Sequence, residues 1–126
     1  MNVILDASAV LALLNAEPGA SVVAGAVSEA AISAVNLSEV VAKLIESGMP
    51  AEAVRETLQE LELEVISFDA HQAYEAGLLR ISTRSLGLSF GDRACLGLAQ
   101  RHGVPVLTTD RNWSRLDAGI EVHLAR

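Results

Sequence analysis

The stretch GVPVLTTDRNW, residues 103–113, decides the fold of this chain, because an apolar run ends there on two threonines and a carboxylate. The run closes at Leu107 and has the composition of a buried strand. Asp110 follows it, where an acid either caps the next helix or helps to hold a metal ion. The local sequence fits both roles. The choice depends on whether other acids stand at equivalent places in the chain.

Short apolar segments alternate along the chain with longer segments of helical spacing. The expected strands are residues 2–6, 30–36, 64–68 and 104–109, with 120–125 as a fifth candidate. The expected helices are residues 7–15, 20–29, 37–48, 51–63, 69–85 and 89–103. Connections of this length favour a parallel sheet covered by helices on both faces. The sequence therefore predicts an α/β protein, a three-layer α/β/α fold with a central, mostly parallel sheet of four to five strands.

The length of the chain fits one domain, residues 1–126. A chain of this length buries roughly two-thirds of the surface that its unfolded form exposes. Hydrophobic residues make up 51% of the chain, and few are aromatic, so we expect an aliphatic core. No apolar run approaches the ~20 residues that span a bilayer, and no cleavable signal is evident. We therefore expect a cytoplasmic protein, with the lone Cys95 as a buried structural thiol.

The net charge of −7 argues at first against a nucleic-acid partner, because phosphate binding depends on Lys and Arg. The distribution of charge weakens this objection. Residues 1–64 hold ten acids against Lys43 and Arg55, a balance of −8, while residues 65–126 hold six acids against seven Arg, a balance of +1. Divalent cations in an acidic site would offset more of the negative charge. An acidic chain is therefore compatible with a metal-dependent nuclease.

Four carboxylates stand near the junctions between expected strands and helices. They are Asp6, Glu39, Asp92 and Asp110. Two of them follow a short polar residue at the spacing of a capping box, Asn36 before Glu39 and Ser89 before Asp92. The other two fit ordinary helix caps, and acids also suit the dipole at a helix start. Each acid taken alone is therefore better explained as a cap than as a catalytic group.

Taken together, the four acids favour a different explanation. In a parallel sheet every strand-to-helix junction lies on one edge, so the acids would converge there. Two like charges about 4 Å apart repel by roughly 4 kcal/mol at an effective dielectric near 20, unless cations or protons intervene. Oxygen ligands without a Cys or His cluster favour Mg²⁺ or Mn²⁺ over zinc. Such a site is suited to hydrolysis of a phosphodiester bond.

Four segments of the chain resemble the PIN-domain family. They are DAS (6–8), NLSE (36–39), LSFGDRACLGLA (88–99) and VLTTDRNW (106–113). The likeness covers nearly the whole chain and is closest to the VapC-type toxins of prokaryotic toxin–antitoxin pairs. It implies a PIN-like fold and an endoribonuclease whose catalytic and metal site, for Mg²⁺ or Mn²⁺, is formed by Asp6, Glu39, Asp92 and Asp110.

The same resemblance implies three partners. The first is an RNA substrate, with structured RNA such as tRNA as the expected class. The second is a cognate antitoxin that inserts residues, often an Arg, into the acidic site. The third is a second copy of the chain, in a homodimer.

Further roles follow from the positions of residues near the acids. The expected supporting residues are Ser8, Thr108, Thr109 and Asn112. Arg93 and Arg111 directly follow two of the acids, so each either contacts RNA phosphates or neutralises the acidic cluster. Trp113 is expected to pack in the core, because a single aromatic residue is a poor basis for base stacking.

Other α/β proteins with acids at strand ends fit less well. A response-regulator receiver needs a Lys after a late strand, whereas the only Lys is Lys43. A haloacid-dehalogenase phosphatase needs D-x-D, and position 8 is Ser8. A dinucleotide-binding domain needs a Gly-rich turn that residues 6–10 lack. Two alternatives stay open: a non-catalytic PIN-like module that binds RNA or protein, and a housekeeping nuclease with the same site.

Overall fold

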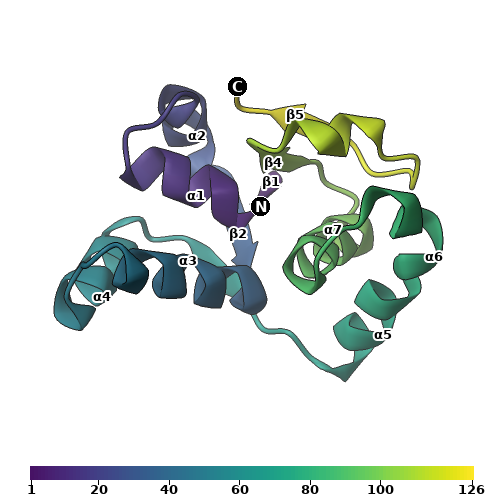
Figure 1. Cartoon of the computed structure of the whole chain (residues 1–126), viewed down its shortest axis with the longest axis horizontal. Helices are drawn as coiled ribbons and strands as arrows, with labels where there is room; N and C mark the ends of the chain where they lie inside the picture. Colours follow the sequence, from purple (N-terminus) through teal and green to yellow (C-terminus); the bar gives the residue numbers. More distant parts are fainter.

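The computed structural model describes all of residues 1–126, and its centre is a five-stranded sheet (Figure 1). The strands are β1 (Val3–Leu5), β2 (Ala30–Ser33), β3 (Glu64–Ile66), β4 (Val106–Thr108) and β5 (Val122–Leu124). Their order across the sheet is β3-β2-β1-β4-β5, and every neighbouring pair is parallel. The predicted α/β class and the parallel sheet are confirmed.

Helices form every connection between the strands. The first two connections hold α1 (Ala7–Leu14), α2 (Ala20–Ala26), the 3₁₀ helix η1 (Val27–Glu29), α3 (Ala34–Glu46) and α4 (Ala51–Glu60). The last two hold α5 (Ala70–Leu78), α6 (Arg80–Thr83), η2 (Arg84–Leu86), α7 (Phe90–His102) and η3 (Arg111–Arg115). Not one of these helices has both the length and the apolar character that a membrane span requires.

Side chains of the short strands alternate between two apolar cores, one on each face of the sheet. Val3 and Leu5 of β1 belong to a core that also contains residues of α1 to α4. Ile4 between them belongs to a second core, with residues of α7 and the fully buried Trp113. Figure 1 shows α3 and α4 on one side of the sheet and α5 to α7 on the other. This is the predicted three-layer arrangement, and it explains why the central strands are apolar throughout.

The second strand is shorter than the sequence predicts. The pattern of residues 30–36 predicts an extended segment, but β2 ends at Ser33, and the next residue begins α3. The side chain of Ser33 accepts a hydrogen bond from the backbone N–H of Val35 and so caps the helix. Asn36 is therefore inside the first turn of α3, and the expected capping box between Asn36 and Glu39 is wrong.

The expected helix 69–85 is divided into α5, α6 and η2. Its start is as predicted, because Asp69 and Gln72 form a reciprocal capping box. Near Leu79 the hydroxyl groups of Ser82 and Thr83 both donate to the Leu79 carbonyl oxygen. Side chains that bond to the backbone in this way compete with regular helix geometry. The run ends at Gly87, which has a positive φ of 62° that favours glycine.

The chain reverses direction across the sheet at β1. It runs outward from β1 through β2 to β3, and then returns to place β4 and β5 on the other side of β1. In open parallel sheets, ligands bind beyond the carboxyl ends of the strands at such a switch point. Asp6, which follows β1, and Asp110, which comes shortly after β4, lie at this switch point.

Candidate metal centre

The Asp6 carboxylate is buried, with only 5% of the residue's surface exposed, and three neighbouring residues donate to it. Ala9 N–H donates to Oδ1 over 2.9 Å, as expected for a side chain that caps α1. The Ser8 hydroxyl lies 2.8 and 2.9 Å from the two oxygens, and the Thr108 hydroxyl donates to Oδ2 over 2.6 Å. Thr108 ends β4, so this last bond joins the ends of the two central strands.

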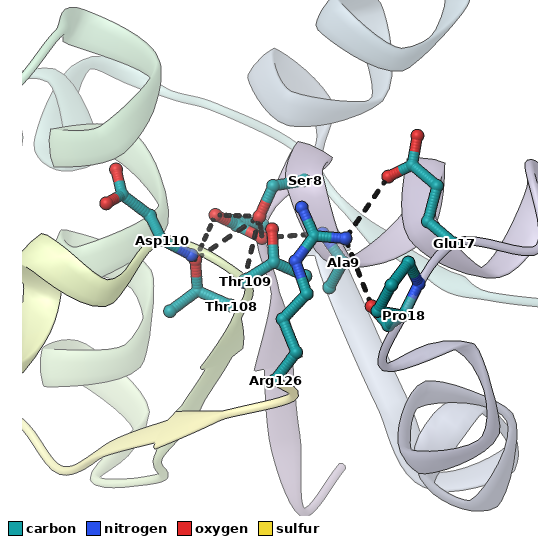
Figure 2. Close-up of polar contacts among 9 residues, drawn as sticks. Ser8, Ala9, Glu17, Pro18, Thr108, Thr109, Asp110 and Arg126 are labelled. Carbon is teal, nitrogen blue, oxygen red and sulfur yellow. Dashed lines mark hydrogen bonds and ion pairs between the residues drawn. The ribbon is translucent and has the colours of Figure 1, made fainter.

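The backbone after β4 fixes the direction in which both hydroxyl groups donate. Thr109 N–H donates to the Ser8 hydroxyl over 3.0 Å, and Asp110 N–H donates to the Thr108 hydroxyl over 3.0 Å. Each hydroxyl therefore accepts a backbone proton and directs its own proton toward Asp6. Figure 2 shows Ser8, Thr108, Thr109 and Asp110 gathered around this point. The predicted supporting residues Ser8 and Thr108 contact Asp6 through their side chains, and Thr109 contacts Ser8 through its backbone.

Burial raises the pKa of Asp6 from 3.8 to about 6, and the nearby charge of Asp92 adds to the increase. The hydrogen bonds from Thr108, Ala9 and Ser8 oppose this shift without cancelling it. Desolvation outweighs three donors because the ionised carboxylate has lost nearly all of its water. The site therefore contains a carboxylate whose charge a bound cation would stabilise.

Glu39 lies in the second turn of α3 and reaches across to the first turn of α7. The buried side chain of Asn36 donates from Nδ2 to Glu39 Oε1 over 2.8 Å and to the Gly91 carbonyl over 3.0 Å. A Cβ atom at Gly91 would overlap the Glu39 carboxylate. Asn36 therefore orients this carboxylate, and the missing side chain at position 91 provides the space for it.

The Asp92 and Asp110 side chains both accept backbone hydrogen bonds at the start of a helix. Asp92 and Ser89 form a reciprocal capping box at the start of α7, as predicted. The Asp110 side chain accepts a 3.0 Å bond from Asn112 N–H at the start of η3. Capping and ligand binding are compatible here, because a carboxylate has more acceptor positions than these single bonds use.

Three of the four predicted acids lie near the buried Cys95. The charges of Asp6, Asp92 and Glu39 each contribute to a raised pKa of Cys95, after the larger effect of burial. Cys95 is fully buried on α7, as predicted. None of the four acids forms an ion pair with a Lys, Arg or His residue. The carboxylates are thus close to one another without a protein counter-charge.

The chemistry of these residues suits a hard cation, although the observed rotamers do not form a finished ligand set. No group of three or more His, Cys, Asp or Glu side chains is positioned to hold a metal ion. The donors are carboxylate oxygens, which Mg²⁺ and Mn²⁺ prefer. Asn36 Oδ1, beside Glu39, is buried without a hydrogen-bond partner, so this polar atom is unsatisfied within the protein. The chemistry of these donors therefore suits such an ion.

The remaining predicted site residues lie at the rim or turn away from the acids. The Arg93 guanidinium donates to the Ala76 carbonyl on α5 over 3.1 Å, which favours a structural role for this side chain. Arg111 and Asn112 are exposed on η3 beside Asp110. Trp113 is fully buried and packs in the core, as predicted.

Two residues of the site are not recognisable as part of it from the sequence. The spacing of Asn36 and Glu39 indicates a helix cap, and no motif gives Gly91 a role of its own. The available signal for Gly91 is its position directly before Asp92, since a glycine inside the first turn of a helix lowers helix stability and often has a packing reason. Asn36 offers no comparable signal, because its partner Gly91 is 55 residues away in the sequence.

The parallel five-stranded sheet and the acids at its switch point define a three-layer α/β/α protein with a candidate acidic metal site. Residues 3–119 match the sequence model of the PIN domain, so the chain belongs to the PIN domain family. No curated protein sequence matches the chain.

Solved structures of similar fold include three VapBC proteins. DNA-bound VapBC from Salmonella typhimurium has a chain that matches with a TM-score of 0.78 and 21% identity, over 100% of this chain and 99% of that one. VapBC-1 from nontypeable Haemophilus influenzae matches with a TM-score of 0.76 and 13% identity, over 99% and 98%. VapBC2 from Rickettsia felis, bound to a promoter DNA fragment, matches with a TM-score of 0.75 and 18% identity, over 98% of each chain. At these identities the likeness establishes the fold.

The raised pKa of Asp6 gives a test of the site that needs no activity. The folded state binds more protons than the unfolded state between about pH 4 and pH 6, so the free energy of unfolding falls as the pH rises through this window. The rise in pKa from 3.8 to about 6 lowers the free energy of unfolding at neutral pH by about 3 kcal/mol. We compare the melting temperature of Asp6→Asn with that of the parent in EDTA. We expect this difference, variant minus parent, to be several degrees more positive at about pH 7.5 than at about pH 5.

The matched control for this measurement is Asp117→Asn, which changes an exposed acid. It should shift the melting temperature equally at both pH values. If Asp6→Asn also behaved in this way, the Asp6 carboxyl would have an ordinary pKa, and the interpretation of its burial would be wrong.

Proposed function

We propose that residues 1–126 act as one PIN-like nuclease domain, a Mg²⁺- or Mn²⁺-dependent endoribonuclease that is the toxin of a type II toxin–antitoxin pair. The observation that carries this proposal is the convergence of Asp6, Glu39 and Asp92 without a counter-charge, in a chain of the PIN family. A protein that only needed helix caps would have no reason to bring these acids together, because their repulsion lowers stability.

In this proposal Asp6, Glu39, Asp92 and Asp110 hold the cation, and each of the first two has a defined support. Ser8 and Thr108 donate to Asp6 and keep it directed toward the site. Asn36 does the same for Glu39. When bound, the cation lowers the pKa of a water molecule and stabilises charge on phosphate oxygens. The protein residues orient the carboxylates, and Arg111 at the rim faces solvent where a phosphate chain would pass.

The proposed partners are a structured RNA such as tRNA, and a cognate antitoxin in the cytoplasm. The similar Salmonella, Haemophilus and Rickettsia structures are of VapBC proteins, two of them bound to DNA. An acidic site without a counter-charge would also bind a basic antitoxin residue such as Arg, since a bidentate guanidinium pairs well with carboxylates. Occupation of the site in this way would exclude the cation.

The acids give a direct test of the nuclease. Asp92→Asn removes one charge but keeps an oxygen that can accept the Ser89 N–H bond, so α7 should still be capped. We expect the variant to fold and to lose cleavage of tRNA or total RNA by at least about 100-fold, a loss typical of a misplaced catalytic group. Cleavage by the parent should require Mg²⁺ or Mn²⁺ and stop in EDTA. Mn²⁺ should raise the melting temperature of the parent much more than that of the variant.

Two results would contradict the proposal. A variant that cut RNA at the parental rate would remove Asp92 from the site and would point to a contaminating nuclease. A parent that bound RNA without cutting it under any metal condition would favour the non-catalytic PIN-like module.

Gly91 gives a second test, which separates geometry from stability. In Gly91→Ala the new methyl group displaces the Glu39 carboxylate, whose flexible side chain can move aside. Alanine also favours the helix by about 1 kcal/mol. We therefore expect a melting temperature equal to or above that of the parent, with cleavage reduced by about 100-fold.

The matched control is Gly97→Ala, on the same helix. A Cβ there would lie 3.6 Å from Ala76 N, an ordinary contact, so activity should be retained. Equal activity of both variants would show that the position of Glu39 does not matter for cleavage.

We also propose that the chain forms a homodimer through α5 and α6. Tyr74, Leu78 and Ile81 are exposed by 76%, 61% and 73%; the first two lie one turn apart on α5, and Ile81 follows on α6. Gly77 lies beside them and faces open space, where an added methyl group would have no neighbour within 4 Å. An exposed apolar stripe of this kind is typical of an interface.

Light scattering after size-exclusion chromatography tests this surface. Tyr74→Glu should convert the dimer to a monomer at micromolar concentration, because it places a charge in the centre of an apolar contact. Val22→Glu, at an exposed apolar residue of α2, should leave the dimer intact. A monomeric parent, or a dimer unaffected by Tyr74→Glu, would refute the interface.

A further inference from the structure

A cavity of about 320 Å³ adjoins the acidic site. It lies between α1, the C-terminal half of α3, and the chain segments that follow β4 and β5. Seven of its nine lining residues are polar, and they include two basic residues, Lys43 and Arg126, and one acid, Glu17. Neither of these side chains has a role in the acidic site.

The cavity shares two lining residues with the acidic site, Ser8 and Thr109. Thr109 N–H donates to the Ser8 hydroxyl, and this hydroxyl contacts the Asp6 carboxylate. A single serine therefore separates the buried acid from the cavity. A ligand that extends beyond the acids in this direction enters the cavity.

Lys43 stands one turn beyond Glu39 on α3. Four residues of a helix rise about 6 Å, a length on the scale of the separation between neighbouring phosphates of one strand. Lys43 is the only lysine of the chain and one of two basic residues before position 65. Its one ion pair, with Glu46, is 3.7 Å long, and both side chains are about two-thirds exposed. Such a pair contributes little, so the ammonium group is free to bind another anion.

Arg126 approaches the cavity from the other side, after β5. Figure 2 shows its guanidinium beside Thr109 and directed toward Glu17 and Pro18. One nitrogen, Nη1, lies 3.5 Å from Glu17 Oε1 and 3.1 Å from the Pro18 carbonyl. The contact with Glu17 is long and partly exposed, and the other nitrogens form no protein hydrogen bond. This guanidinium therefore retains donors for an oxyanion.

We propose that this cavity binds a phosphate of the RNA strand beside the phosphate that is cleaved, with Lys43 and Arg126 as its cationic ligands. Ser8 and Thr109 line the side of the cavity nearest the acids. The proposal rests on the proposed nuclease function, since it assigns a neighbouring phosphate of the same substrate. It explains how an acidic protein holds a polyanion: the cation compensates the acids at the cleaved bond, and these two residues bind the strand next to it.

Binding of a short, fluorescein-labelled single-stranded RNA of mixed sequence to Asp92→Asn protein, followed by fluorescence anisotropy, tests the cavity. In this inactive background, Lys43→Ala and Arg126→Ala should each weaken binding by about tenfold, the effect of one charged hydrogen bond. Each should also reduce the slope of log K against log salt by about 0.7, the value for one phosphate contact with a single strand. The matched control, Arg101→Ala, removes an equal charge at the far end of α7 and should change neither.

A gain of binding is a stronger test, because misfolding cannot produce it. Glu17→Gln removes the carboxylate that competes for Arg126. We expect RNA to bind several-fold more tightly to this variant, and the gain to disappear when Arg126→Ala is added.

Cleavage by the active chain separates this inference from the nuclease proposal. With Asp92 intact, Lys43→Ala should raise KM by about tenfold and leave kcat close to the parental value, as for a contact made equally in the ground and transition states.

If the parent cuts RNA while Lys43→Ala and Arg126→Ala match Arg101→Ala in KM and affinity, the phosphate site is wrong and the nuclease stands. If the parent does not cut but RNA affinity depends on both residues, the nuclease is wrong and the anion site stands. Variants that weaken only antitoxin binding would assign the cavity to that protein and overturn the inference.

Discussion

The 2.6 Å hydrogen bond from Thr108 to Asp6 is the interaction on which the rest of the site depends. It joins the ends of β1 and β4, the two strands between which the sheet reverses its order. A buried carboxylate has to be satisfied by donors, and here each donor comes from an element that the fold has already fixed. The backbone N–H groups of residues 109 and 110 orient the two hydroxyls, and the hydroxyls hold Asp6. The geometry of the acid is thus determined by parallel strand pairing.

The same arrangement has a cost in stability that is informative about function. Burial raises the pKa of Asp6 despite its donors, so the ionised form at neutral pH opposes folding. Glu39 and Asp92 add like charge near the same point, and no basic side chain of the chain compensates it. Selection for stability alone would favour neutral caps at these junctions. Acids kept at this cost are explained when a cation, or a basic group of a partner, completes the site.

Much of the fold, and the positions of the four acids near strand ends and helix starts, could be predicted from the sequence, because both depend on local patterns. Alternating apolar segments indicated the parallel sheet, and parallel strands place their ends on one edge. The features that could not be predicted from the sequence depend on contacts between distant segments or on single side chains. Ser33 ends β2 because its side chain caps α3, which no periodicity reveals. The contact between Asn36 and Gly91 spans 55 residues, and the cavity at Lys43 and Arg126 joins segments even further apart.

The distribution of charge in space also explains how an acidic chain would hold the polyanionic substrate that we propose. Counted along the sequence, the excess of acids lies in residues 1–64, which include two of the four site acids. In the fold, Lys43 from that acidic half and Arg126 from the other half line one cavity beside those acids. Local fields, rather than net charge, act on a bound strand within a Debye length of about 8 Å at physiological salt. In the proposed complex, a strand that crosses Ser8 would pass from the acidic centre to a cavity lined by Lys43 and Arg126, and this change of sign would fix its position on the surface.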